Sequence, residues 1–423
     1  MGLLYDDAVI IRQSEKEGEP CLITVNCPDK TGLGCDLCRI ILFFGLTVVR
    51  IDVSTDGKWC YIVFWVVGKP STRWSLLKKR LMGACPCFLE ACGISYYRDE
   101  LQNPKPADVF LLKFCCNDRL GLLHDVTKVL CELELTIERV KVSTTPDGKV
   151  MDLFFLTDTR ELLHTKMRKE DTYDHLKAII GDSTISCDIE MVSPETAFSC
   201  QEPSFLSEAV ARHMFDMEYN LSPDTCSING HQNDSVAFKC PSITTDNLLS
   251  PSHTLVQIVC EDHKGLLYDV MRTLKDCNIQ ISYGRFTRKG ETECEMDLFI
   301  MQEDGKKILD PSKQDSLTSR LKMELSRPLR VALVSRGPDN ELLVANPIEL
   351  SGKGRPLVFY DITLALKMLS RPIFSAEIGR YRIDDREWEV YRVLLDEGEI
   401  ISSVSKKEIE ETVWKMLMSW EEQ

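Results

Sequence analysis

The sequence lacks an apolar run long enough to cross a bilayer, which takes about 20 residues. The run Ile62–Val67 is far shorter than that. The first residues have no basic region followed by an apolar one, as a signal peptide has, and they are too acidic for a transit peptide. We therefore expect a cytoplasmic or nuclear protein with no membrane partner.

Positive charge is also scarce. Lys and Arg number 51 against 66 Asp and Glu, which gives a formal net charge of −15. A phosphate backbone would be repelled on average, so we expect no nucleic-acid partner. The 18 cysteines are scattered and several lie within apolar runs, which is typical of buried thiols in a reducing compartment.

Motifs of catalysis and of metal binding are missing as well. Cys35-x-x-Cys38 has no second pair nearby at zinc spacing, and small-residue helix packing explains it better than a metal or redox role. Gly352-x-Gly354 lacks the Lys-Ser/Thr of a P-loop, and no Gly-x-Ser-x-Gly elbow occurs. We predict a protein that is not an enzyme and that needs no metal and no cofactor.

What the sequence does contain is an internal repeat. Three segments read Asp-x-x-Gly-Leu, beginning at Asp29, Asp118 and Asp262, and each has a second Asp four residues after its Gly. Each segment follows a β-like run and begins a helix whose apolar positions advance by four, three, one and three residues, which keeps one helix face apolar. Tyr360-Asp361-Ile362 begins a degraded fourth copy with the same spacing.

A β-hairpin and a second helix follow each first helix. Asp56-Gly57 and Asp147-Gly148 separate alternating apolar runs, as hairpin turns do. The resulting order β-α-β-β-α-β predicts an α+β protein of ferredoxin-like modules with antiparallel sheets, the fourth lacking its last strand. The predicted division is 19–100, 107–193, a polar and partly disordered linker at 194–252, then 253–336 and 340–422. Within the linker, Phe205–Tyr219 has the pattern of one isolated amphipathic helix.

With this motif and this element order, the chain resembles ACT-domain proteins, in particular the plant proteins made of tandem ACT repeats. Those are similar in turn to the paired ACT domains of the bacterial nitrogen-sensing uridylyltransferase, but no nucleotidyltransferase segment precedes the repeats here. The resemblance implies a non-catalytic sensor that binds an amino acid or similar small metabolite between paired domains and regulates an unidentified protein target. The fourth copy reads Ser351–Pro356 where the loop should be, so the resemblance implies no site of the usual kind there.

The first loop of each copy has suitable chemistry for an amino acid. Its Gly permits close approach, the first N–H groups of the helix can bind a carboxylate, and its Asp can accept from an ammonium group. Simple helix capping by the Asp explains the same pattern, and the second Asp is expected to face the positive end of the helix dipole. The predicted ligand-binding residues are Asp29, Gly32, Leu33 and Gly34, then Asp118, Gly121, Leu122 and Leu123, then Asp262, Gly265, Leu266 and Leu267.

Two other functions remain open at this point. A scaffold whose loops bind nothing would have the same repeats, and RNA-recognition domains share the element order and stack bases on strand aromatics such as Phe64 and Phe154.

Small sheets leave exposed edges, so we expect the repeats to pair edge to edge within the chain, not necessarily with sequence neighbours, and a homodimer would cover such edges as well. Ala8–Ile11 is expected to add a strand to a module edge, that of the fourth copy being the candidate.

Overall fold

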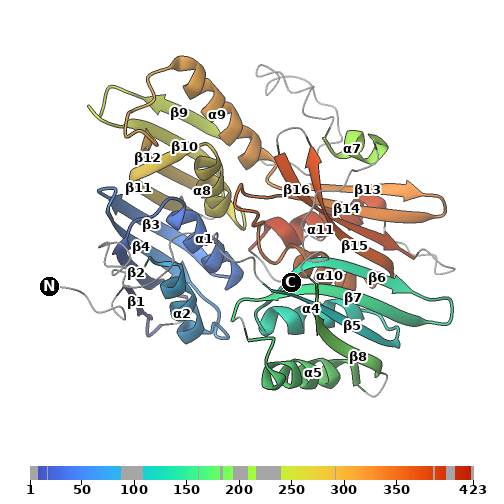
Figure 1. Cartoon of the computed structure of the whole chain (residues 1–423). Helices are drawn as coiled ribbons and strands as arrows, with labels where there is room; N and C mark the ends of the chain where they lie inside the picture. Colours follow the sequence, from blue (N-terminus) through green and yellow to red (C-terminus); the bar gives the residue numbers. More distant parts are fainter. Residues whose placement is uncertain are drawn as a thin grey trace. The chain divides into compact units, whose positions relative to one another are not determined.

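The computed structural model describes residues 8–86, 108–193, 208–215, 240–396 and 405–420, apart from 17, 161, 182–183, 291 and 384–385. The chain divides into two compact units (Figure 1). The first unit contains Met1–Glu100, Ala237–Pro328 and Met418–Trp420. The second contains Leu101–Val236, Leu329–Leu417 and Glu421–Gln423.

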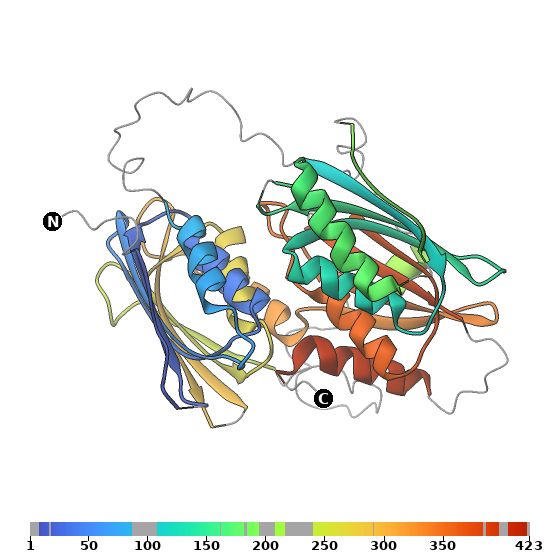
Figure 2. The same ribbon diagram turned by 90° about the horizontal axis from the view of Figure 1, so that it is seen from below.

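The first unit is an eight-stranded antiparallel sheet built from the first and third repeats, with its helices on one face (Figure 2). Helices α1 and α8 pack against each other across the boundary between the two repeats. In sheet order the strands are β1 (Val9–Arg12), β2 (Cys21–Pro28), β4 (Trp59–Val67), β3 (Thr47–Thr55), β11 (Ile279–Lys289), β12 (Glu293–Gln302), β10 (Thr254–Glu261) and β9 (Ser242–Asp246), and the helices are α1 (Leu33–Phe43), α2 (Trp74–Ala84), α8 (Leu266–Asp276) and α9 (Pro311–Ser326).

The second unit repeats this plan with the second and fourth repeats. Helices α4 and α10 pack together here, as α1 and α8 do in the first unit. The strands in order are β13 (Arg330–Arg336), β14 (Asp339–Pro347), β16 (Arg386–Leu395), β15 (Ile373–Ile383), β6 (Leu135–Thr144), β7 (Lys149–Asp158), β5 (Val109–Asn117) and β8 (Thr184–Met191), and the helices are α4 (Leu122–Glu132), α5 (Lys166–Ile180), α7 (Glu208–Phe215), α10 (Val358–Met368) and α11 (Lys406–Met418).

Edge-to-edge pairing joins repeats that are distant in sequence. In the first unit β3 and β11 pair antiparallel, with Ser54 opposite Tyr283. In the second unit β6 and β15 pair in the same way, with Ser143 opposite Ser375. The prediction that the repeats pair edge to edge within the chain, not necessarily with their sequence neighbours, is confirmed, as is the α+β ferredoxin-like architecture.

The edge strands differ from the prediction. The predicted third repeat, 253–336, includes β13, but this strand forms a hairpin with β14 and provides the edge of the fourth repeat. The third repeat instead takes its edge from β9, which lies within the predicted linker and pairs with β10. An edge position antiparallel to the first strand can be filled from either end of a module, so element order alone did not decide it. Among the described residues no strand follows α11, and β13 takes the edge position that the prediction left empty in the fourth module.

The N-terminal strand also exists, but at another edge. Val9 lies opposite Val25, so β1 pairs with β2 of its own repeat and not with the fourth. The end of the predicted first repeat, from residue 87 to 100, falls outside the described residues. The isolated helix predicted in the linker is described as α7, and its Phe215 packs on Trp388 with ring centroids 4.9 Å apart.

Candidate functional site

The glycine of each predicted loop caps its helix in a left-handed conformation. The φ angles of Gly32, Gly121 and Gly265 are 79°, 76° and 90°. A residue with a Cβ adopts this region at a cost, so the conformation explains why glycine recurs in the motif. The fourth repeat has Leu357 there, at a φ of 65°, and it therefore keeps the turn without the glycine.

A lysine of the partner repeat packs over two of these glycines. A Cβ on Gly32 would lie 2.7 Å from Cε of Lys275, and one on Gly121 would lie 2.8 Å from Cγ of Lys367. The two lysines occupy equivalent positions near the ends of α8 and α10. Their recurrence six residues after Asp269 and Asp361 is a signal that the sequence analysis missed.

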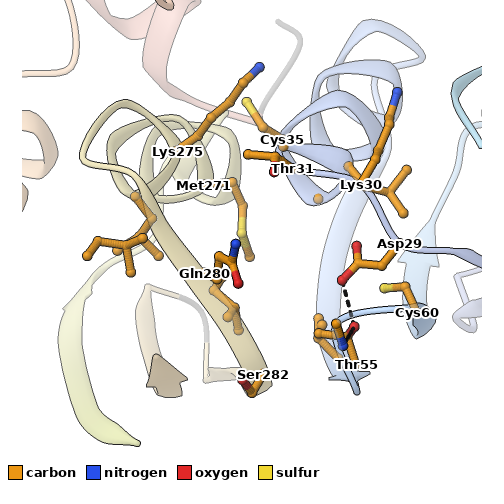
Figure 3. A pocket seen from close by; sticks show the side chains of 18 of the residues that line it. Asp29, Lys30, Thr31, Cys35, Thr55, Cys60, Met271, Lys275, Gln280 and Ser282 are labelled. Atoms are coloured by element: carbon orange, nitrogen blue, oxygen red, sulfur yellow. Dashed lines mark hydrogen bonds between the residues drawn. The ribbon is translucent and has the colours of Figure 1, made fainter. Parts of the chain in front are cut away.

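The first loop borders a cavity of about 360 Å³ between the first and third repeats. Asp29 accepts a hydrogen bond of 2.6 Å from the hydroxyl of Thr55, and Figure 3 shows Met271 and Gln280 approaching from the third repeat. The cavity brings the predicted residues Asp29, Gly32, Leu33 and Gly34 together with Thr31, Cys35, Lys275, Ile281 and Ser282.

The second loop borders an equivalent cavity of about 440 Å³ between the second and fourth repeats. On the side of the fourth repeat it is lined by Lys367, Arg371 and Thr363, whose hydroxyl oxygen is 3.2 Å from Nδ1 of His124. Burial, and then the charge of Lys367, lowers the pKa of His124 to about 4, so this ring is neutral at pH 7. The predicted residues Asp118, Gly121, Leu122 and Leu123 all line this cavity, as does Asp152.

The second Asp of the motif binds cations at both cavities. Lys30 Nζ lies 3.1 Å from Asp36, and Arg119 and Lys367 lie 2.7 and 2.6 Å from Asp125. Burial raises the pKa of Asp125, but the hydrogen bonds from Lys367 and Arg119 outweigh that effect and lower it. This Asp sits in the first helical turn, as expected near the dipole, and it also fixes the loop and the partner lysine in place.

The third loop has a different environment. The space beside it measures only about 20 Å³ and is lined by Trp420 as well as Asp262, Gly265, Leu266 and Leu267. The Lys264 N–H donates a 2.8 Å hydrogen bond to the carbonyl of Met418, and Asp262 lies 3.3 Å from Arg288. Residues of the chain itself therefore fill the position that a ligand would take beside this loop.

The fourth loop is bonded to its own module. Nη2 of Arg355 donates to the Leu417 carbonyl at 2.9 Å, and a Cβ on Gly354 would lie 2.8 Å from Asn346. The degraded sequence of this copy thus matches a loop that is packed for structure. Within the described part of the chain, no His, Cys, Asp and Glu side chains cluster as metal ligands, and no helix is long and apolar enough to span a membrane.

The cysteines that stood out in the sequence are buried. Cys35 and Cys38 form no disulfide and lie inside the packing of α1, and burial raises the pKa of Cys38 to about 12. A thiol so far from ionising is a poor nucleophile and a poor metal ligand at pH 7. This geometry fits the packing role that the sequence analysis preferred.

Comparison with known proteins identifies the family. Family models match residues 242–339 as an ACR9-like, ACT-like domain, 11–86 as the N-terminal part of the ACT domain-containing protein ACR10, and 340–419 as the C-terminal part of ACR9. The chain is 60% identical to the ACT domain-containing protein ACR10 of Arabidopsis thaliana over 100% of both chains, and 52% identical to ACR9 over 99% of this chain and 100% of that one. The chain therefore belongs to the plant ACT-domain repeat proteins of the ACR9 and ACR10 type.

Proposed function

We propose that the protein is a non-catalytic sensor that binds an α-amino acid, or a similar small zwitterion, in the two cavities beside the first and second loops. The observation that carries the proposal is their equivalence. Each cavity lies between two paired repeats, with a left-handed glycine and a helix start on one side and a lysine of the partner repeat on the other. The third and fourth loops are left out of the proposal because the chain's own residues pack against them.

The parts of an amino acid would find complementary groups in these cavities. Lys275 or Lys367 adds positive charge beside the helix start, where unpaired N–H groups and the dipole favour a carboxylate. Asp29 or Asp118 faces the same cavity and can accept from an ammonium group. Because the ligand would touch both repeats, binding would stabilise their pairing. A regulated partner protein could respond by binding the ligand-bound state with a different affinity.

Thermal shift of the full chain against the twenty amino acids tests the proposal. A ligand present at 100 times its Kd stabilises the unit that binds it by roughly 2.7 kcal/mol. Lys275→Met should weaken binding in the first cavity at least tenfold, because it removes the cation but keeps the packing on Gly32. Lys289→Met is the matched control, since Lys289 is exposed and pairs with Glu295 outside the cavity.

If no amino acid shifts the unfolding of either unit, the sensor proposal fails and the scaffold function is favoured. If mixed RNA binds in a filter assay, the RNA-recognition function replaces both. The proposed location remains cytoplasm or nucleus, and it is supported by the described cysteines, none of which forms a disulfide. A regulated protein target and a homodimer are further proposals, which affinity capture in the presence of ligand and light scattering would examine.

A further inference from the structure

A carboxyl group is buried where the repeat pattern calls for an apolar residue. Asp152 lies on β7, opposite Phe114 of β5 and Val142 of β6. Phe114 lies four residues before the loop Asp118, and the residues four before Asp29 and Asp262 pair in the same way with Ile62 and Met296. The first and third repeats therefore have an apolar residue where the second has Asp152. The side chain of Asp152 is 1% exposed, and it shares its strand face with buried residues such as Phe154.

This buried carboxyl is incompletely satisfied. Its Oδ1 has no hydrogen-bond partner among the described residues. A hydrogen bond from the Ser143 backbone favours the ionised form and lowers the pKa of this carboxyl group. Burial, and then the charge of Asp118, raises the pKa of Asp152 to about 8. A carboxyl group with one oxygen left unpartnered is costly in a protein interior, and this one borders a cavity.

The neighbouring loop carboxyl differs from its counterpart in the first unit. Asp29 is bonded by the Thr55 hydroxyl, whereas the equivalent Thr144 donates instead to the Ile373 carbonyl at 3.3 Å. Burial raises the pKa of Asp118, and the negative charge of Asp396 raises it further. A hydrogen bond from the Arg119 backbone lowers this pKa but does not outweigh the other two effects. The second cavity therefore has two carboxyl groups that lack the hydroxyl donor found in the first.

The cations of the second cavity do not neutralise these groups. Arg119 and Lys367 both pair with Asp125, and His124 is kept neutral by burial. Arg371 also lines the cavity. Burial and the charge of Asp118 raise the pKa of Asp152, and no cation is among the groups that lower it. A cation supplied by a ligand could therefore form an ion pair with the carboxylate of Asp152.

We propose that the second cavity selects an amino acid with a basic side chain, of the lysine or arginine class, whose cation pairs with Asp152 while the first cavity takes an uncharged side chain. The inference rests on the proposed function and adds the ligand class of one site. In the first cavity Ile62 occupies the equivalent place, so a cationic side chain that reaches this position would lose hydration without meeting a carboxyl group there. The two units would then report on different amino acids.

Calorimetry with matched ligand pairs tests this selectivity on the full chain. We expect L-lysine to bind at least tenfold more tightly than L-norleucine, which lacks the side-chain ammonium, and L-arginine more tightly than L-citrulline. Asp152→Ile copies the residue of the first cavity and should remove this preference without unfolding the second unit, because it replaces a poorly satisfied polar group by an apolar one. Met151→Ile is the matched control, since Met151 is the 59% exposed neighbour on the other strand face.

A second readout follows the proton. An ammonium beside Asp152 favours its ionised form, so lysine binding at pH 7 should release close to one proton, visible as a dependence of the binding heat on buffer ionisation enthalpy. Asp152→Ile should abolish that dependence. If lysine binds no better than norleucine, or if the preference survives in Asp152→Ile, the inference is overturned while the sensor proposal stands. If neither basic nor neutral amino acids bind at all, the proposed function falls and takes the inference with it.

Discussion

A buried ion pair between two helices of the third repeat offers the sharpest stability test. Arg272 of α8 is 0% exposed, and its Nη2 lies 2.7 Å from Oε2 of Glu324 on α9. Asp269 lies 3.9 Å from the same guanidinium group. Arg272→Met therefore leaves Glu324 and Asp269, which are 2% and 1% exposed, without their main cation.

The expected cost follows from this burial. Removing one partner of a buried pair destabilises a protein by about 3–5 kcal/mol. Arg320 lies 3.2 Å from Glu324 and keeps part of the compensation, so we expect the lower end, about 3 kcal/mol. For a unit of this size, that loss lowers Tm by roughly 6–12 °C. Replacing both Arg272 and Glu324 by apolar residues should recover most of the loss, because no uncompensated charge from the pair then remains.

Urea unfolding of the single and double variants measures the coupling between the two groups. Arg285→Met is the control, because Arg285 is half exposed and its 3.0 Å pair with Asp52 lies at the surface, where such pairs contribute about 1 kcal/mol at most. If Arg272→Met costs no more than Arg285→Met, the buried pair is not the contact that holds α8 to α9. The same conclusion follows if the double variant is no better than Arg272→Met.

Three further outcomes are expected. Gly32→Ala should destabilise the first unit in urea by more than Gly45→Ala, since both carry about 1–2 kcal/mol of left-handed strain but only the first also displaces Lys275. In the Asp152→Ile variant, which lacks the opposing titration of Asp152, the second unit should lose stability as pH falls from about 6.5 to 4, because His124, with a folded pKa of about 4, binds its proton more readily when unfolded; adding His124→Gln should flatten that part of the pH profile. Phe154→Ala, at a fully buried position, should cost about 3–5 kcal/mol by the same denaturation assay, and a smaller loss would contradict the tight packing of this core.

Much of the fold could be predicted because its determinants are local. A left-handed glycine at Gly32, Gly121 and Gly265 and an apolar stripe behind each one are properties of a few consecutive residues. They sufficed for the β-α-β-β-α-β order, the family resemblance and the loop residues that line both cavities. Asp152 was readable in the same way, as a polar break in the alternation of β7, but its meaning depended on knowing which face of the strand was buried.

The sequence by itself determined the repeats, their modules and the residues of the first loops. Only the tertiary structure decided which repeats pair, which strand fills each edge and which loops keep a cavity. Those outcomes depend on contacts between residues far apart in the chain, such as Lys275 over Gly32 and Trp420 beside Gly265, and no local pattern encodes such distances. A sheet edge can pair with a strand that comes before or after the module in the chain, and an αL turn forms whether a ligand or a tryptophan lies beside it. Tertiary packing therefore determines which strand fills each edge and which loop keeps a cavity.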